Sequence, residues 1–118
     1  MADDIKIQSV KRAPPPPELP MLGRVDQKDA SFFGRSNYVA ALEEKKFIFG
    51  VKRVDRRRHL YVVGKSGVGK SKLLELLIRQ DIAFGYGLCL IDPHGDVIEE
   101  ALDFVPENRI NDVCVIDP

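Results

Sequence analysis

Four residues of the sequence stand at the spacing of a phosphate-binding loop. Gly64, Gly69, Lys70 and Ser71 satisfy the pattern G-x-x-x-x-G-K-[ST], the P-loop or Walker A motif. Glycines let backbone N–H groups wrap around a polyphosphate, because they leave room and adopt left-handed backbone angles without strain. The Lys70 ammonium is expected to reach the β- and γ-phosphates of ATP or GTP, and the Ser71 hydroxyl to ligate Mg²⁺. We therefore predict that the nucleotide is bound by eight residues: Gly64, Lys65, Ser66, Gly67, Val68, Gly69, Lys70 and Ser71.

The elements around this loop predict an α/β fold. Residues 59–63 are a short apolar run that ends at the loop, and residues 71–84 repeat apolar side chains at helical spacing. Residues 88–91 and 113–116 are two further short runs that are apolar on both faces, as buried parallel strands are. A second helix is expected over residues 97–104, so helices alternate with strands. This order is typical of a parallel sheet with right-handed crossovers.

The region before the loop is expected to hold an arm and two short elements. Residues 1–30 are predicted to be a proline-rich extended arm or linker, and residues 31–118 the front portion of a nucleotide-binding domain. The four prolines at 14–17 favour the extended polyproline II form and exclude a helix or a central strand. A semi-rigid spacer is the simpler interpretation, and a ligand for a proline-binding module is the alternative. A short helix is expected to begin at residues 39–42, and a short strand at 47–49.

A carboxylate that follows the second predicted strand is a candidate for catalysis. Asp92 lies at the sheet edge where ligands bind in open α/β folds, so it joins Lys70 as a candidate catalytic residue. The alternative is that Asp92 ends the strand before a proline, while Asp96 caps the next helix. His94 lies between them, either as a base or as an ordinary turn residue. Asp117 repeats the Ile-Asp-Pro pattern after the third predicted strand.

Composition is that of an ordinary globular domain. Apolar residues make up 44% of the 118 residues and charged residues 31%. No apolar run approaches the roughly 20 residues of a membrane helix, and the first residues do not resemble a secretory signal. Cys89 and Cys114 lie within apolar runs and are predicted to be buried, reduced thiols. These features favour a cytoplasmic chain.

Charge is distributed unevenly along a chain of zero net charge. Residues 1–91 carry 17 basic and 10 acidic side chains, whereas residues 92–118 carry one basic and eight acidic ones. The basic excess is densest at residues 52–59, KRVDRRRH, with five Lys or Arg and one Asp. Such a run is typical of a solvated strand and turn, or of a surface that contacts the phosphates of a nucleic acid or a nucleotide. Charge alone would give no sequence specificity.

Taken together, residues 47–118 resemble the FtsK/HerA superfamily of hexameric DNA-translocating ATPases, and within it most of all the ATPases of type IV secretion coupling and conjugative transfer. The resemblance rests on the basic run with His59, on the loop at 64–71, and on Asp-Pro-His-Gly-Asp at 92–96, with weaker similarity at 33–37. It implies a RecA-like core that binds ATP and Mg²⁺. It also implies a homo-hexameric ring around DNA, placed beside a membrane secretion apparatus at the cytoplasmic face.

The chain departs from the superfamily pattern after the loop. In that superfamily the Walker B carboxylates and the arginine finger come much later, whereas Asp92 lies only 22 residues after Lys70 and does not inherit that role. We therefore expect the front portion of a larger motor, which hydrolyses ATP when completed. The alternative is a truncated nucleotide-binding module without turnover. A small P-loop kinase or GTPase is disfavoured, because the guanine-specificity motif and the acceptor-binding lid are missing.

Overall fold

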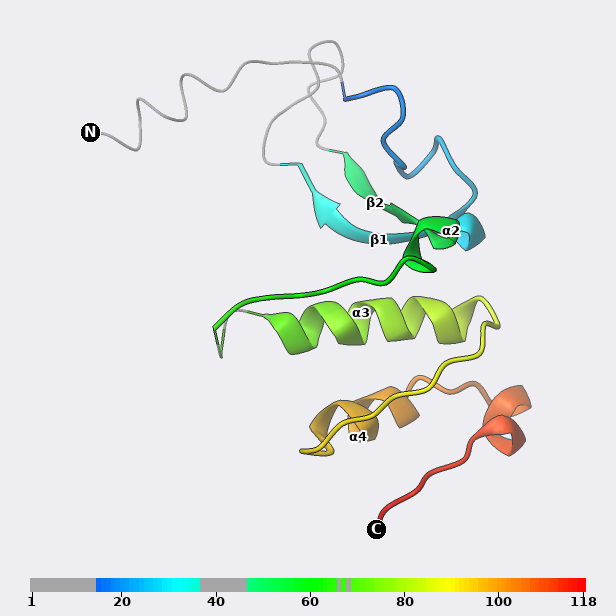
Figure 1. The fold of residues 1–118 in the computed structure, drawn as a ribbon. Coiled ribbons are helices and arrows are strands. Elements are labelled where there is room, and N and C mark those ends of the chain that lie inside the picture. Colours follow the sequence, from blue (N-terminus) through cyan, green and yellow to red (C-terminus); the bar gives the residue numbers. More distant parts are fainter. Residues whose placement is uncertain (1–14, 37–46, 66, 68) are drawn as a thin grey trace. The chain divides into compact units, whose positions relative to one another are not determined.

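The chain divides into two units, and each is described by itself. The computed structural model describes the following residues: 15–36, 47–65, 67 and 69–118. Contacts group the chain into Met1–Leu60 and Tyr61–Pro118. Figure 1 shows the first unit as a short hairpin with one turn of helix, and the second as helices joined by extended segments. The helix start that we predicted at residues 39–42 lies outside the described residues.

An antiparallel hairpin organises the first unit. It is preceded by a 3₁₀ turn, η1 (Gln27–Asp29). Strands β1 (Ala30–Arg35) and β2 (Ile48–Lys52) pair with each other, and a register shift between Phe32 and Gly34 marks a β-bulge in β1. The strand that we predicted at 47–49 is confirmed, although β2 extends further along the chain than the sequence pattern indicated.

A glycine and three aromatic rings hold the hairpin strands close together. Gly50 is buried, and a Cβ atom added to it would lie 1.8 Å from the carbonyl oxygen of Ser31. The rings of Phe33 and Phe47 each have centroids 6.1 Å from that of Phe49, in edge-on and tilted arrangements that aromatic pairs prefer. Only glycine at position 50 therefore allows this approach of the two backbones.

The chain before β1 covers the other edge of β2. The N–H of Gly50 donates to the carbonyl of Pro20 at 3.0 Å. The Arg24 guanidinium donates to the carbonyls of Pro16 and Pro17 at 2.6 and 3.2 Å. The Pro20 carbonyl thus binds β2 directly, whereas the carbonyls of Pro16 and Pro17 bind Arg24 within the chain before β1.

Two helices form the second unit, and both were predicted. α3 (Lys70–Ala83) and α4 (Asp96–Leu102) lie close to their expected bounds, and a 3₁₀ helix, η2 (Glu107–Asp112), follows them. The guanidinium of Arg79 on α3 lies 4.0 Å from the ring centroid of Phe104, a cation–π contact that joins α3 to the end of α4.

The apolar core of the second unit lies between these helices. Leu77 and Ile82 of α3 are buried together with Ala101 of α4. They come from the apolar helix faces that the sequence periodicity indicated.

α3 ends where the sequence predicted, in a Schellman motif. Gly85 takes the left-handed φ of 79° that this motif needs. The N–H of Tyr86 donates to the Asp81 carbonyl at 2.9 Å, and that of Gly85 to the Ile82 carbonyl at 3.1 Å. Arg109 adds guanidinium bonds to the carbonyls of Ile82 and Tyr86 at 3.1 and 3.4 Å. A cation and a glycine therefore satisfy the carbonyl end of the helix.

The three apolar runs that we predicted as parallel strands are extended but unpaired. Residues 59–63, 88–91 and 113–116 form no strand in the described part of the chain, where the sheet is the antiparallel pair of β1 and β2. In Figure 1 the runs around 61–65, 88–91 and 113–118 cross the second unit in the same direction. Strand formation requires a hydrogen-bonded neighbour, and apolar side chains in these runs remain open to solvent, with Ile91 86% exposed.

The prediction that both cysteines are buried is wrong. Cys89 and Cys114 are free thiols and exposed, because each lies in one of the unpaired extended segments.

Candidate nucleotide-binding site

Two glycines of the phosphate loop have left-handed backbone angles. Gly67 has a φ of 82° and Gly69 a φ of 99°. A Cβ atom at either position would meet nothing within 4 Å, so the backbone angle, and not a shortage of space, demands glycine. Residues 66 and 68 lie outside the described residues. The turn at Gly69 directs the chain from the loop straight into α3.

The helix that follows the loop begins without a side-chain cap. Gly69 occupies the N-cap position of the 14-residue α3, and the first turn contains no acidic residue. The N–H of Leu73 is bonded to the Gly69 carbonyl at 2.9 Å, so it belongs to the helix ladder. The N–H groups before it are the orphan donors of a helix start, and they lie at the positive end of the helix dipole. Such an end binds anions.

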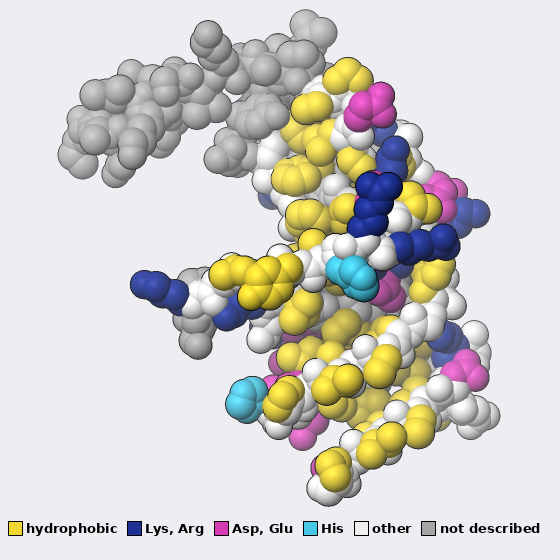
Figure 2. Space-filling model, viewed as in Figure 1, with side chains coloured by type: hydrophobic (Ala, Val, Ile, Leu, Met, Phe, Trp, Pro, Cys, Tyr) yellow, Lys and Arg dark blue, Asp and Glu magenta, His cyan; other side chains and the backbone are white. Residues whose placement is uncertain are grey.

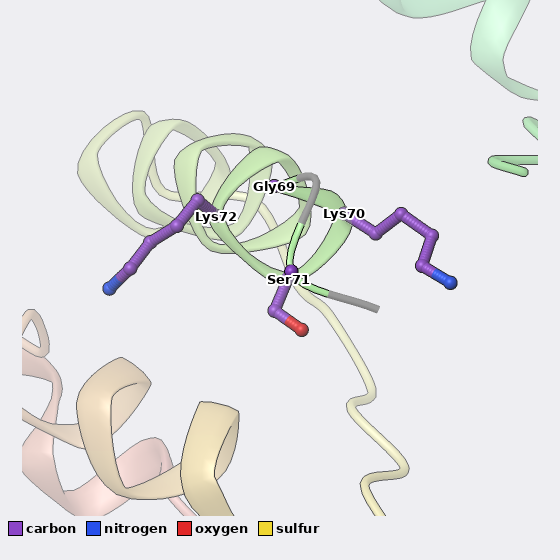
Figure 3. Close-up of a pocket in the computed structure, with 5 residues that line it drawn as sticks. Gly69, Lys70, Ser71 and Lys72 are labelled. Atoms are coloured by element: carbon purple, nitrogen blue, oxygen red, sulfur yellow. The ribbon is translucent and has the colours of Figure 1, made fainter. Parts of the chain in front are cut away.

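A concavity of about 450 Å³ lies at this helix start. It is lined by Gly67, Gly69, Lys70, Ser71 and Lys72. Figure 3 shows the Ser71 hydroxyl and the Lys70 ammonium extending to different sides of the helix start, and Lys72 extending away from Lys70. Four of the loop residues that the sequence singled out therefore border one open space, whereas Gly64 and Lys65 do not line it.

Lys70 closes the loop on itself. Its ammonium donates to the carbonyl oxygen of Gly64, the first residue of the motif, and the contact is partly buried. The cation is therefore held at the loop by the loop's own backbone.

A charge network beside the loop was not foreseen. The Lys72 ammonium lies 3.0 Å from a carboxylate oxygen of Glu75 and 3.2 Å from one of Glu100, so it links α3 to α4. A hydrogen bond with Glu100, followed by that from Lys72, lowers the pKa of Glu75. Hydrogen bonds to Glu75 and Glu100 raise the pKa of Lys72. The spacing of Lys72 and Glu75 was a visible signal, whereas nothing in the sequence pointed to Glu100.

Asp92 caps α4 from outside the helix. Its carboxylate accepts hydrogen bonds from the N–H groups of Val97 at 2.8 Å, Ile98 at 3.4 Å and His94 at 3.1 Å. Burial raises the pKa of Asp92, but hydrogen bonds from the backbone of Val97, His94, Ile98 and Gly95 outweigh it, and the net pKa is lowered.

The interpretation of Asp96 as the helix cap is therefore wrong. Gly95 holds the N-cap position with a φ of 84°, and Asp96 is the first residue of the helix. The reason is the tight turn after Asp92, which brings the carboxylate back over the first turn of α4.

The remaining candidates lie on the surface. His94 and Asp96 are exposed at the start of α4, and Asp117 is exposed in the last extended segment. Within the described part of the chain, no hydrogen bond or ion pair joins Asp92 or His94 to the loop residues. The geometry thus gives the loop an anion-binding arrangement and gives Asp92 a structural contact.

The loop and helix start have the chemistry that a polyphosphate requires. They offer orphan N–H donors, an ammonium at the loop and a hydroxyl at the rim of the concavity. The family comparison agrees with this chemistry. Residues 51–116, more than half of the chain, match the family described as Helicase HerA, central domain. The chain belongs to this family.

The HerA family match spans α2, the loop, α3, α4 and η2. It confirms the FtsK/HerA superfamily that the motifs indicated, whereas kinship with type IV secretion coupling ATPases stays a prediction. Comparison with curated proteins and with solved structures gave no significant match. None of the helices in the described ranges has the length and apolar character to cross a membrane.

Proposed function

We propose that the chain is the ATP-binding portion of a DNA-translocating motor ATPase, of the kind that serves type IV secretion or conjugation. One observation carries the nucleotide part: left-handed glycines lead into an uncapped, acid-free helix start with Lys70 beside it. Membership of the HerA family supports the motor part. The secretion role rests on the sequence resemblance alone, through the basic run with His59, the loop and the Asp-Pro-His-Gly-Asp segment.

Each loop residue has a definite task in this proposal. The N–H groups at the start of α3 hold phosphate oxygens, and the Lys70 ammonium exchanges the Gly64 carbonyl for the outer phosphates. The Ser71 hydroxyl, which points away from the helix start, offers Mg²⁺ one ligand. When bound, Mg²⁺ neutralises charge on the phosphates.

Asp92 has a structural role in this proposal, because its carboxylate accepts backbone hydrogen bonds at the start of α4. Its Oδ2 accepts from N–H groups in the first turn of α4, and its Oδ1 accepts from the N–H of His94 in the preceding turn. The carboxylate therefore stabilises the segment that follows the loop helix. A direct catalytic role for Asp92 stays a prediction. For residues 1–118 alone we expect ATP binding without turnover, because in the superfamily the Walker B carboxylates and the arginine finger come much later in the chain than Asp92.

The assembled form is proposed from the family. The three extended segments follow each other with helices between them and cross the second unit in one direction, which supports parallel pairing in a RecA-like core. We propose a homo-hexameric ring around DNA, working at the cytoplasmic face beside a membrane secretion apparatus.

The first experiment measures binding of a fluorescent ATP analogue, with Mg²⁺, to two matched variants. Lys70→Ala removes the ammonium that contacts Gly64, and Lys65→Ala removes an exposed ammonium from the same loop. We expect Lys70→Ala to weaken binding at least tenfold. Lys65→Ala keeps the backbone N–H that this residue offers to the phosphates, so it should weaken binding far less. Equal effects would show that loop charge alone attracts the nucleotide, and no binding by the unaltered chain would refute the site.

A second experiment separates a motor from a module that only binds. Phosphate release is measured with and without duplex DNA, for this chain alone and for a protein completed with the remaining strands of the family fold. A motor shows Lys70-dependent hydrolysis that DNA stimulates in the completed protein. Binding without hydrolysis in the completed protein supports the alternative, a nucleotide-binding module.

A further inference from the structure

Basic side chains around α2 (Arg53–Arg56) separate into two groups. The first group is engaged inside the first unit. The Arg53 Nε donates to the Lys28 carbonyl at 2.7 Å, and an Arg56 guanidinium nitrogen donates to the Ser31 hydroxyl at 2.9 Å. Both arginines are half-buried. They anchor α2 to the hairpin and are committed to the fold.

The second group follows α2 directly, and its side chains do not anchor α2 to the hairpin. Arg57, Arg58 and His59 are exposed, and in the described ranges no hydrogen bond or ion pair engages their side chains. Their backbone is nevertheless fixed. The N–H of Arg58 donates to the Asp55 carbonyl at 3.1 Å, and that of His59 donates to the Arg56 carbonyl at 3.0 Å. Three consecutive cationic or hydrogen-bonding side chains are thus presented on an ordered turn, which we call the basic tip.

The surroundings of the basic tip are also positive. The described residues of the first unit contain eight Lys or Arg and four Asp or Glu. Figure 2 shows the Lys and Arg side chains gathered around α2. An anionic partner is therefore attracted to this face, and the effect depends on ionic strength.

We propose that the basic tip contacts the phosphate backbone of DNA. This deepens the proposed function and rests on it. Arginine forks match phosphate oxygens, and a histidine donates a hydrogen bond in either protonation state. Phosphate contacts set position and register but read no bases, so the tip holds DNA of any sequence.

The test measures the affinity of the whole chain for a short labelled DNA duplex as a function of salt. Arg57→Gln and Arg58→Gln each remove one charge from the tip. Arg35→Gln is the matched control, because Arg35 is exposed at the end of the hairpin that lies away from α2. Arg35 pairs with Ile48 at the start of β2, whereas α2 follows the other end of β2, where Lys52 pairs with Ala30. Each tip variant is expected to lower the slope of log affinity against log salt by about 0.9, and the control to leave it unchanged.

Several outcomes would overturn the proposal that the basic tip contacts DNA. They are no binding of DNA by the unaltered chain, tip variants that bind like it, or a control that loses as much as the tip variants. Tighter binding of an RNA duplex of the same sequence, or of anionic lipid vesicles, would assign the tip to another partner.

The same variants separate this proposal from the nucleotide site. ATP binding by Arg57→Gln should equal that of the unaltered chain, and DNA binding by Lys70→Ala without nucleotide should be intact. If Lys70→Ala fails to weaken ATP binding, the proposed nucleotide site is refuted. The salt dependence of DNA binding by the tip variants still tests whether the basic tip contacts DNA.

Discussion

Replacing Gly69 with alanine tests whether the backbone angle of the phosphate loop is needed for binding. Gly69 has a φ of 99°, and the added Cβ meets no atom within 4 Å. Steric exclusion therefore contributes nothing, and the change isolates the cost of a left-handed angle. For a residue other than glycine that cost is about 1–2 kcal/mol.

The strain must appear in one of two measurements. If the variant keeps the angle without nucleotide, the free energy of unfolding falls. If the variant relaxes to another angle and regains it on binding, affinity falls by roughly 5- to 30-fold instead. Alanine also restricts the unfolded chain, which returns about 0.4–1 kcal/mol of stability. After correction for this gain, we expect the loss in free energy of unfolding and the loss in free energy of binding to add up to the cost of the left-handed angle.

Gly87→Ala supplies the correction. Gly87 has an ordinary φ and open space around its Cβ position, so alanine there shows only the gain from the unfolded chain. Urea unfolding and titration with a fluorescent ATP analogue give both quantities for each variant. If Gly69→Ala matches Gly87→Ala in stability and in affinity, the left-handed angle is not part of the binding-competent loop and the reasoning is refuted.

Three further changes test the scaffold. Gly50→Ala places a Cβ 1.8 Å from the Ser31 backbone oxygen, so we expect urea unfolding to show a loss of about 3 kcal/mol or more in the hairpin unit. His59→Gly relieves a φ of 75°, so the free energy of unfolding should rise by up to about 1 kcal/mol, and a loss would contradict the strain. The lowered pKa values of Glu75 and Asp92 mean that their stabilisation is complete above their ordinary values, 4.5 and 3.8, and is lost as pH falls through the folded values. Thermal unfolding followed over this acid range should show that loss, and a midpoint that does not change with pH would contradict it.

The sequence predicted what depends on neighbours in the chain. Apolar periodicity gave α3 and α4, because a helix is defined by contacts three and four residues apart. Gly85 marked the end of α3, since only glycine takes the required angle readily. The left-handed angles of Gly67 and Gly69 also arise within one short segment, whereas nucleotide binding by the loop stays a prediction.

Contacts between distant residues were not predictable in this way. Arg53 and Arg56 are bound to residues 25 positions away, and Lys72 to Glu100, 28 positions away. No local pattern separates these side chains from the exposed arginines of the basic tip. The extended apolar runs show the same limit. Their composition favours strands, but a strand forms only where a second segment lies alongside and provides hydrogen-bond partners.

The choice between Asp92 and Asp96 as helix cap shows why local patterns are ambiguous. Both carboxylates precede the apolar stripe of α4, and both satisfy the preference for acidic residues near a helix start. Gly95 decides between them, because its left-handed angle turns the chain so that the earlier carboxylate reaches the helix N–H groups.

The bond between Lys70 and the Gly64 carbonyl gives the phosphate loop an internal competitor for its own ammonium. A ligand gains from this cation only by the difference between its oxygen and a neutral carbonyl oxygen. That difference grows with the negative charge of the ligand, so a triphosphate displaces the carbonyl far more readily than a single phosphate ion does. In the proposed nucleotide site, a single phosphate ion therefore competes poorly with the Gly64 carbonyl for the Lys70 ammonium, whereas a triphosphate competes well.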